Sequence, residues 1–248
     1  MSSYSDYFSS TAVGYASFRP TYPAELFAWI ATQAARHSRA WDTGTGSGQA
    51  AILLARHFDE VVATDPSFAQ LVNAKPAERV YYAAMTAESS ALPNASVDLV
   101  TVAQALHWFD LDRFYREVER VLTPDGVVAV WTYGLLTIDP EIDARISRFY
   151  KEEVGKYWPA ERALVDAGYS GIAFPFREIE TPSFAMRATW TLDQLSGYLE
   201  TWSAVTRYTK ANGRSPVKEF ISGMRPLWGE ASRERLVCWS LELRMGRI

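Results

Sequence analysis

Residues 42–48 read Asp42-Thr43-Gly44-Thr45-Gly46-Ser47-Gly48, between an apolar run that ends in the acid and an apolar helix-like run over residues 49–57. Glycine is required where a backbone turns sharply or where a ligand approaches it closely. The N-terminus of the following helix offers unpaired N–H groups beside the same turn. The stretch therefore predicts a strand, a glycine turn and a helix that together bind a small ligand.

A second apolar run, residues 60–64, ends in Asp65 and is stopped by Pro66. An acid about 20 residues after the first glycine of such a turn is placed to accept the ribose hydroxyls of an adenosine-type ligand. A dinucleotide fingerprint has its third glycine one residue later than Gly48, to seat a pyrophosphate. The acid Asp42 would repel a pyrophosphate and would suit an ammonium group. The turn therefore favours a ligand with a methionine-like end over NAD.

The remaining pattern alternates short apolar runs with helical periodicity, which is typical of a parallel sheet covered on both faces. We expect strands at residues 40–42, 60–65, 80–83, 97–102 and 127–131, and helices at residues 23–36, 49–57 and 111–122, with a turn at residues 124–126. After about residue 140 the pattern changes to helical stretches at residues 141–157, 191–205 and 216–228, a strand-like run at residues 176–187 and a last strand at residues 236–243.

Composition limits the classes of partner. The net charge is −4, which argues against binding to nucleic acid, because phosphate contacts need an excess of Lys and Arg on one face. A single cysteine, Cys238, excludes intrachain disulfides and multi-cysteine metal sites, and the three histidines have no metal-ligand spacing. No apolar run approaches the roughly 18 residues that span a bilayer, and residues 1–10 lack the pattern of a signal peptide. We expect a soluble, cytoplasmic monomer or homodimer that acts on a small molecule, without a metal and away from membranes.

Two further motifs accompany the glycine turn: Arg19-Pro20-Thr21-Tyr22-Pro23 and His107-Trp108-Phe109-Asp110, with an Ala87-Glu88 pair between them. With these motifs the chain resembles the class I S-adenosylmethionine-dependent methyltransferases, and more narrowly the methyltransferase type 11 branch that contains trans-aconitate methyltransferase. The resemblance runs from about residue 7 to the C-terminus.

Pattern and resemblance together predict an α/β fold: a Rossmann-like, doubly wound, mostly parallel seven-stranded sheet with an antiparallel last strand and a helical insertion near the C-terminus. We interpret residues 1–248 as a single methyltransferase domain. Residues 1–37 would form an N-terminal arm and helix, residues 38–135 the cofactor-binding core, and residues 190–232 a helical insertion that acts as a lid.

The resemblance implies S-adenosyl-L-methionine as cofactor, S-adenosyl-L-homocysteine as product, and roles for particular residues. In similar enzymes the loop after the third strand holds the adenine, the segment after the fourth strand lies against the methionine part, and an N-terminal arm closes over the cofactor. Combined with the glycine turn and the two acids, this gives the expected cofactor-binding residues: Tyr15, Arg19, Asp42, Gly44, Thr45, Gly46, Gly48, Asp65, Pro66, Thr86, Ala87, Glu88, Ala103 and Gln104.

The reaction is expected to be methyl transfer to a small-molecule acceptor, for which the resemblance favours a carboxylate oxygen. A carboxylate nucleophile needs no base, whereas a hydroxyl or amine would need one, and His107 is the candidate. Whether His107 contacts substrate or is structural stays open at this point. Cations for an anionic acceptor could come from the insertion, through Arg207, Lys210 and Arg214. The alternatives are an NAD-linked oxidoreductase and a catalytically silent cofactor-binding protein.

Overall fold

The computed structural model describes residues 20–248. They fall into two compact units. The first, called the sheet unit, contains Tyr22–Tyr133, Ala163–Phe184 and Leu241–Ile248; the second, called the helical unit, contains Gly134–Arg162 and Ala185–Ser240. Tyr15 and Arg19, expected at the cofactor site, lie outside the described residues.

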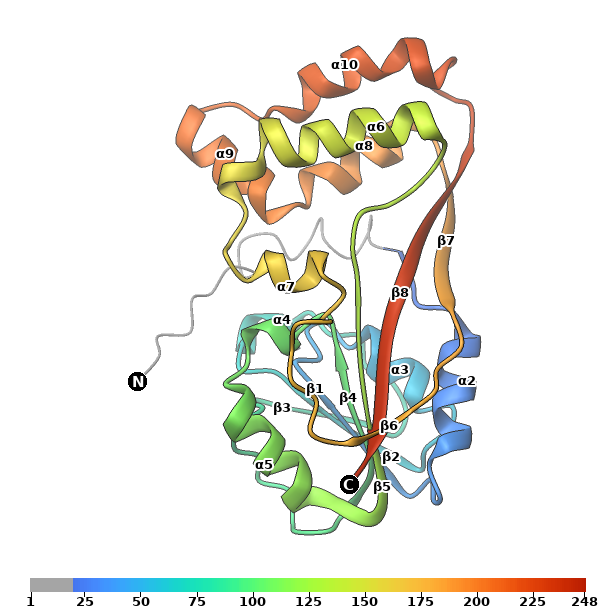
Figure 1. The fold of residues 1–248 in the computed structure, drawn as a ribbon, viewed down its shortest axis with the longest axis vertical. Coiled ribbons are helices and arrows are strands. Elements are labelled where there is room, and N and C mark those ends of the chain that lie inside the picture. The colour runs from blue at the N-terminus through green and yellow to red at the C-terminus, as the bar shows by residue number, and fades with distance from the viewer. Residues whose placement is uncertain (1–19) are drawn as a thin grey trace. The chain divides into compact units, whose positions relative to one another are not determined.

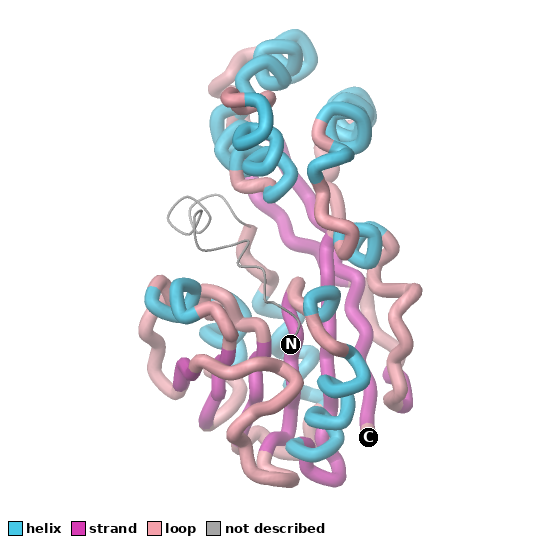
Figure 2. Tube along the Cα trace, turned by 90° about the vertical axis from the view of Figure 1, so that its left-hand side faces the viewer, coloured by secondary structure: helices cyan, strands magenta, loops and turns pink. Residues whose placement is uncertain are grey.

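Within residues 20–248 the strands form one sheet in the order β3-β2-β1-β4-β5-β8-β6, with β7 also paired to β8. The first five strands are parallel, and β8 runs antiparallel to both β5 and β6. In Figure 2 the strands are drawn in magenta. The bounds are β1 (Arg39–Thr43), β2 (Glu60–Thr64), β3 (Val80–Ala83), β4 (Val97–Ala103), β5 (Leu122–Tyr133), β6 (Arg177–Ile179), β7 (Phe184–Trp190) and β8 (Arg235–Arg247). The predicted fold class is confirmed, including the antiparallel last strand.

Two strands differ in detail from the prediction. The strand-like run at residues 176–187 divides into β6 and β7, because Pro182 between them has no backbone N–H to donate to a ladder. The residues of the expected turn, 124–126, lie inside β5. The pairing of β5 with β4 is irregular there, because its register shifts between Val97 and Leu99 of β4. The sheet of the described residues therefore has an eighth strand, and β5 is longer at both ends than the apolar run predicted.

The helices of the sheet unit lie on both faces of the sheet, with α2 (Ala24–Gln33) and α3 (Gln49–Leu54) on one side and α5 (Leu111–Val121) on the other (Figure 1). Helix α5 begins where the side chain of Asp110 accepts a hydrogen bond from the N–H of Arg113, at 3.2 Å. Its apolar face, Phe114, Val118 and Val121, is fully buried against the sheet core. Shorter helices follow β2 and β4: α4 (Phe68–Val72) and the 3₁₀ turn η1 (Leu106–Trp108).

The helical unit contains α6 (Pro140–Arg148), α8 (Leu192–Glu200), α9 (Ser203–Asn212) and α10 (Val217–Trp228). The last three lie within residues 190–232, where a helical insertion was expected. Two stretches predicted as continuous helices are broken. Helix α6 gives way to a π-helical turn (Phe149–Glu153), and α8 and α9 are separated at Thr201 and Trp202. Helix α7 (Arg162–Asp166) joins the two units along the chain.

Candidate functional site

The glycine turn connects β1 to α3 through three residues in the left-handed region of backbone conformation. The φ angles are +68° at Gly44, +56° at Gly46 and +82° at Gly48. Residues with a Cβ rarely adopt such angles, which accounts for the glycine at each position. The turn is closed by a bond from the N–H of Gly48 to the carbonyl of Thr45, at 2.9 Å, so that Gly48 becomes the N-cap of α3.

Two of these glycines are also packed tightly, and one is not. A Cβ on Gly44 would lie 2.6 Å from Cβ of Ala105, and one on Gly48 would overlap the hydroxyl oxygen of Tyr82. Gly44 therefore brings the turn against the segment that follows β4, and Gly48 brings it against β3. Around Gly46, by contrast, no described atom other than those of Gly46 and its two chain neighbours lies within 4 Å of the position that a Cβ would take. That side of the turn is open to a ligand.

The carboxylate of Asp42 lies at the end of β1 and is fully buried. It accepts hydrogen bonds from the hydroxyl groups of Thr45, at 2.5 Å, and Thr101, at 2.7 Å. The pKa of Asp42 is raised to about 6, mainly by burial of the carboxyl group; the hydroxyl groups of Thr45 and Thr101 lower the pKa, and the negative charge of Asp65 contributes to raising it. Asp42 thus ties the turn to β4 and places a buried acid beneath it.

Asp65 follows β2 and is held by the backbone. Its Oδ2 accepts from the N–H of Gly46 at 2.9 Å, and its Oδ1 accepts from the N–H of Ser67 at 2.8 Å. The side chain is buried, while the neighbouring Pro66 is exposed. A carboxylate has about four acceptor positions, so two backbone bonds orient the group and leave it able to accept from ligand hydroxyls as well.

Two buried hydroxyl groups near the turn lack a hydrogen-bond partner within the described part of the chain. They are Oγ1 of Thr43, which precedes Gly44, and Oγ of Ser67, two residues after Asp65. Unsatisfied buried polar atoms are uncommon in folded proteins and call for an explanation such as a ligand or a bound water. Both therefore mark positions at which a polar ligand would be favourable.

The loop after β3 makes a tight turn in which Thr86 pairs with Ser89. Thr86 is exposed, whereas the side chain of Ala87 is buried in the core of the sheet unit. Glu88 accepts a hydrogen bond from the backbone N–H of Asp110 at 3.0 Å, which joins this loop to the N-terminus of α5. The expected adenine loop is thus anchored at the two residues that follow its exposed threonine.

The segment that leaves β4 turns sharply at Gln104, whose φ is +56°. Its amide oxygen accepts from the hydroxyl of Thr132 and from the N–H of Tyr133, and its amide nitrogen donates to the carbonyl of Tyr133 at 3.0 Å. The Gln104 side chain is therefore bound to the end of β5. The backbone N–H of Gln104 donates to the carbonyl of Trp131 at 2.9 Å, and the preceding Ala103 pairs with the same residue. Ala103 and Gln104, called the rigid edge below, therefore form a fixed surface that a ligand can contact.

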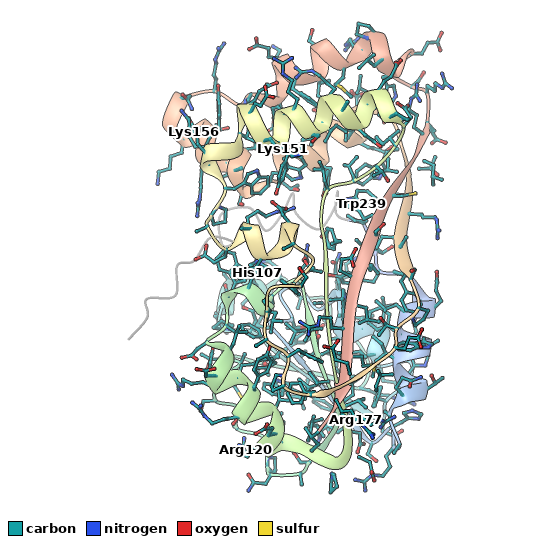
Figure 3. The ribbon with its side chains drawn as sticks, in the orientation of Figure 1. His107, Arg120, Lys151, Lys156, Arg177 and Trp239 are labelled. Carbon is teal, nitrogen blue, oxygen red and sulfur yellow. The ribbon has the colours of Figure 1, made fainter. Side chains whose placement is uncertain are left out.

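His107 lies on the 3₁₀ turn directly after this edge and is half-buried (Figure 3). Its Nδ1 lies 2.8 Å from the hydroxyl oxygen of Tyr169, and its ring is 4.7 Å from the ring of Trp108. Phe109, two residues on, packs on Phe114 and on the sheet core. His107 therefore lies two residues after Ala105, the residue of the same segment that packs against Gly44 of the glycine turn.

The cations expected from the helical insertion lie on and after α9, in the helical unit. Arg207 donates to the carbonyl of Tyr157 at 3.4 Å, Lys210 is exposed, and Arg214 is exposed and 4.0 Å from Glu219. Across residues 20–248 we find no group of three or more His, Cys, Asp or Glu side chains that could hold a metal ion. No helix among these residues is long and apolar enough to cross a membrane.

Three residues with a direct place in this arrangement were not found by sequence reasoning. Ser67 had a usable signal, since it follows Asp65 by two residues. Thr101 lies inside an apolar strand and resembles any other β-branched strand residue. Tyr169 is 62 positions from His107 along the chain, so only the folded structure brings the two together.

The chain is similar to known methyltransferases. Residues 41–130 match a family described as a methyltransferase domain. A protein of Dictyostelium discoideum that is named as a methyltransferase is 36% identical over 220 residues, covering 87% of this chain and 84% of that protein. A protein of Saccharomyces cerevisiae named as an S-adenosylmethionine-dependent methyltransferase is 28% identical over 243 residues, covering 82% of each chain. A solved structure from Anaeromyxobacter dehalogenans, bearing the name type II methyltransferase, superposes with a TM-score of 0.88 at 44% identity, covering 93% of this chain and 98% of that one.

Proposed function

Since the chain belongs to the class I S-adenosylmethionine-dependent methyltransferases, we propose that it methylates a small-molecule acceptor, and that the acceptor atom is a carboxylate oxygen. The observation that carries the cofactor half of this proposal is the pair of buried acids at the glycine turn. Asp42 and Asp65 are close enough for the charge of one to raise the pKa of the other. Two neighbouring carboxylates favour a cationic ligand and disfavour a pyrophosphate.

The residues at the turn fit S-adenosylmethionine. Asp65, oriented by the N–H groups of Gly46 and Ser67, would accept the ribose hydroxyls. The open side of Gly46 allows the cofactor to approach the backbone closely. Oγ1 of Thr43 and Oγ of Ser67 are buried polar atoms whose hydrogen-bonding capacity a bound ligand would use.

The remaining contacts follow from the elements that lead away from the turn. Thr86, Ala87 and Glu88 would border the adenine, and the rigid edge at Ala103 and Gln104 would border the methionine part. Asp42 would act through its charge, because both of its oxygens already accept hydroxyl groups. Arg19 remains our prediction for the methionine carboxylate, and Tyr15 remains our prediction for the mouth of the same site.

When bound, S-adenosylmethionine supplies a methyl group that its sulfonium has already activated for in-line displacement. The chain's own part is to orient the acceptor and to exclude water from the reacting atoms. A carboxylate acceptor is already ionised at neutral pH, so no side chain has to remove a proton from it. The resemblance of the sequence to the trans-aconitate methyltransferase branch is what suggests this class of acceptor.

The first experiment is a calorimetric titration of the protein with S-adenosylmethionine, S-adenosylhomocysteine, NAD and NADP. We expect binding of the first two and none of the dinucleotides; the reverse would mean an oxidoreductase. The second is a screen of small carboxylic acids, phenols and amines for formation of S-adenosylhomocysteine. Methylation of a phenol or amine but of no acid would contradict the carboxylate proposal, and binding without turnover on any acceptor would indicate a catalytically silent protein.

The pH dependence of the rate provides an independent test of the acceptor class. With a carboxylate, the maximal rate should be nearly constant from about pH 6 to pH 9, and His107→Gln should retain it within roughly tenfold, less than the loss typical of a general base. A steep rise through the pH range in which histidine titrates, absent in His107→Gln, would instead make His107 a base acting on a protonated nucleophile.

A further inference from the structure

The contact between His107 and Tyr169 joins two parts of the sheet unit that are far apart in the sequence. His107 is half-buried on the turn after β4, and Tyr169 is almost completely buried, with 1% of its surface exposed. The hydroxyl oxygen and Nδ1 are 2.8 Å apart, an ordinary distance for a hydrogen bond between an oxygen and a ring nitrogen.

The backbone of Tyr169 is held in a conformation that an aromatic residue rarely adopts. Its φ is +61°, directly after Gly168 at +60°. Such conformations are costly for residues with a Cβ, persist only where the surroundings determine them, and concentrate at functional sites. The N–H of Tyr169 donates to the carbonyl of Leu164 at 2.9 Å, and its carbonyl accepts from the N–H of Ile172 at 3.0 Å.

The last strand provides a second constraint on the same segment. One guanidinium nitrogen of Arg244, on β8, donates to the carbonyls of Tyr169 at 3.3 Å and Ile172 at 2.7 Å, and another pairs with Glu178 at 2.7 Å. The backbone of Tyr169 is therefore held by bonds that do not involve His107. A residue that positions another side chain is expected to be held in this way, by bonds that are independent of that side chain.

We propose that Tyr169 is a positioning residue: its hydroxyl donates to Nδ1 of His107 and so holds the imidazole proton on Nε2. A phenol is a good donor, and the unprotonated nitrogen of a neutral imidazole is the matching acceptor. The hydrogen bond at one ring nitrogen determines which tautomer is present at the other. His107 then offers an Nε2–H donor and not a basic nitrogen.

This assignment rests on the proposed function and makes it more specific. An Nε2–H donor is suited to orient an oxygen atom that carries negative charge, as a carboxylate acceptor does. It is not suited to remove a proton from a phenol or an amine. Tyr169 and His107 together would thus select an acceptor that needs orientation and no base.

The test is the ¹⁵N NMR spectrum of the histidine rings at about pH 8, where a neutral imidazole is expected. The chain has three histidines, so His107→Gln identifies the His107 signals by their loss. We expect the wild-type signals of one fixed tautomer with the proton on Nε2. In Tyr169→Phe, which keeps the ring and removes the hydroxyl, the two nitrogen shifts should move toward those of a tautomer mixture.

The matched control is Tyr115→Phe. The Tyr115 hydroxyl is also in the core of the sheet unit, but it donates to the carbonyl of Ala173, at 2.7 Å, instead of to His107. It should leave the His107 shifts unchanged. Unchanged shifts in Tyr169→Phe, or a wild-type tautomer with the proton on Nδ1, would overturn the proposal.

A binding measurement separates this proposal from the proposed function. Calorimetry should give Tyr169→Phe and wild type the same dissociation constant for S-adenosylmethionine within about twofold. A wild-type protein that does not bind S-adenosylmethionine would refute the function and leave the tautomer result standing. With the best acid from the acceptor screen, Tyr169→Phe should lower kcat/KM for the acceptor by about threefold to tenfold, the value of one hydrogen bond, with KM for S-adenosylmethionine unchanged.

Discussion

The carboxylate of Asp65 accepts a hydrogen bond from the N–H of Gly46 at 2.9 Å, so the residue that directly follows β2 is bound to the middle of the glycine turn. Each partner thereby fixes the other: the carboxylate holds the turn, and the turn orients the carboxylate. This relationship makes the two residues parts of one proposed binding surface, and both can be tested through cofactor affinity.

Asp65→Ala should weaken binding of S-adenosylmethionine and S-adenosylhomocysteine by at least about tenfold, because hydrogen bonds to a charged group are lost. Calorimetry on the folded variant measures this. Asp59→Ala is the control, since it removes the same charge from an exposed position one residue before β2. Equal dissociation constants for Asp65→Ala and wild type would remove Asp65 from the site.

Gly46→Ala should lose cofactor affinity by about tenfold or more, because a methyl group would occupy the open side of the turn. The matched control is Gly213→Ala at the C-cap of α9, where φ is +74° and no described atom lies near an added Cβ. Both variants should lose about 1 kcal/mol of stability through left-handed backbone strain, seen as similar decreases in Tm. A normal affinity in Gly46→Ala would show that the turn is a feature of the fold only.

The charge of Asp42 should make cofactor preference depend on pH. With a pKa of about 6, the carboxyl group is protonated below that pH and negatively charged above it. A negative charge favours the cationic sulfonium over the neutral thioether, so the preference for S-adenosylmethionine over S-adenosylhomocysteine should grow severalfold between about pH 5 and pH 7. Asp42→Asn should bind both ligands with a ratio that does not vary with pH. A constant ratio in the wild type would exclude an electrostatic role for Asp42.

Glu117 should stabilise the loop between β3 and β4, which contains the residues that we expect to border the adenine. It accepts from the N–H and hydroxyl of Ser90, each at 2.6 Å, and pairs with Arg120 at 2.6 Å; Figure 3 labels Arg120 on α5. The hydrogen bonds of Arg120 hold the pKa of Glu117 at about 2, below its ordinary value of 4.5. For a depressed pKa, the stabilisation is complete above about pH 4.5 and is lost as the pH falls toward about 2.

We therefore expect Glu117→Gln to lower Tm at neutral pH by roughly 3–6 °C and to reduce the fall in Tm between about pH 4.5 and pH 2. Glu119→Gln, at an exposed position on the same helix, is the control and should have little effect on either quantity. Thermal melts over this pH range provide the measurement. The same pH dependence in Glu117→Gln and wild type would assign the acid sensitivity to other carboxyl groups.

Much of this protein was determined by the sequence alone, because the signals are local. The turn at residues 44–48 was predictable, since its three glycines adopt a left-handed backbone conformation that residues with a Cβ rarely adopt. The parallel strands were predictable as well, because a strand buried on both faces, such as β4, is mostly apolar. The elements with weaker local signals were less well predicted: β5 extends through the expected turn, and two long helical patterns are broken.

Only the tertiary structure decided which side chains meet. Asp42 accepts a hydrogen bond from the hydroxyl group of Thr101 on a neighbouring strand, and the side chain of Gln104 is bound to the end of β5. The hydroxyl group of Tyr169 contacts His107, although the two residues are 62 positions apart in the sequence. Local periodicity reports which face of an element is buried, but a hydrogen bond between distant residues depends on strand order and register, which no short window contains. For that reason the sequence was enough to predict the glycine turn and its two acids, whereas the fold decided how these acids are held and that the hydroxyl group of Tyr169 lies beside His107.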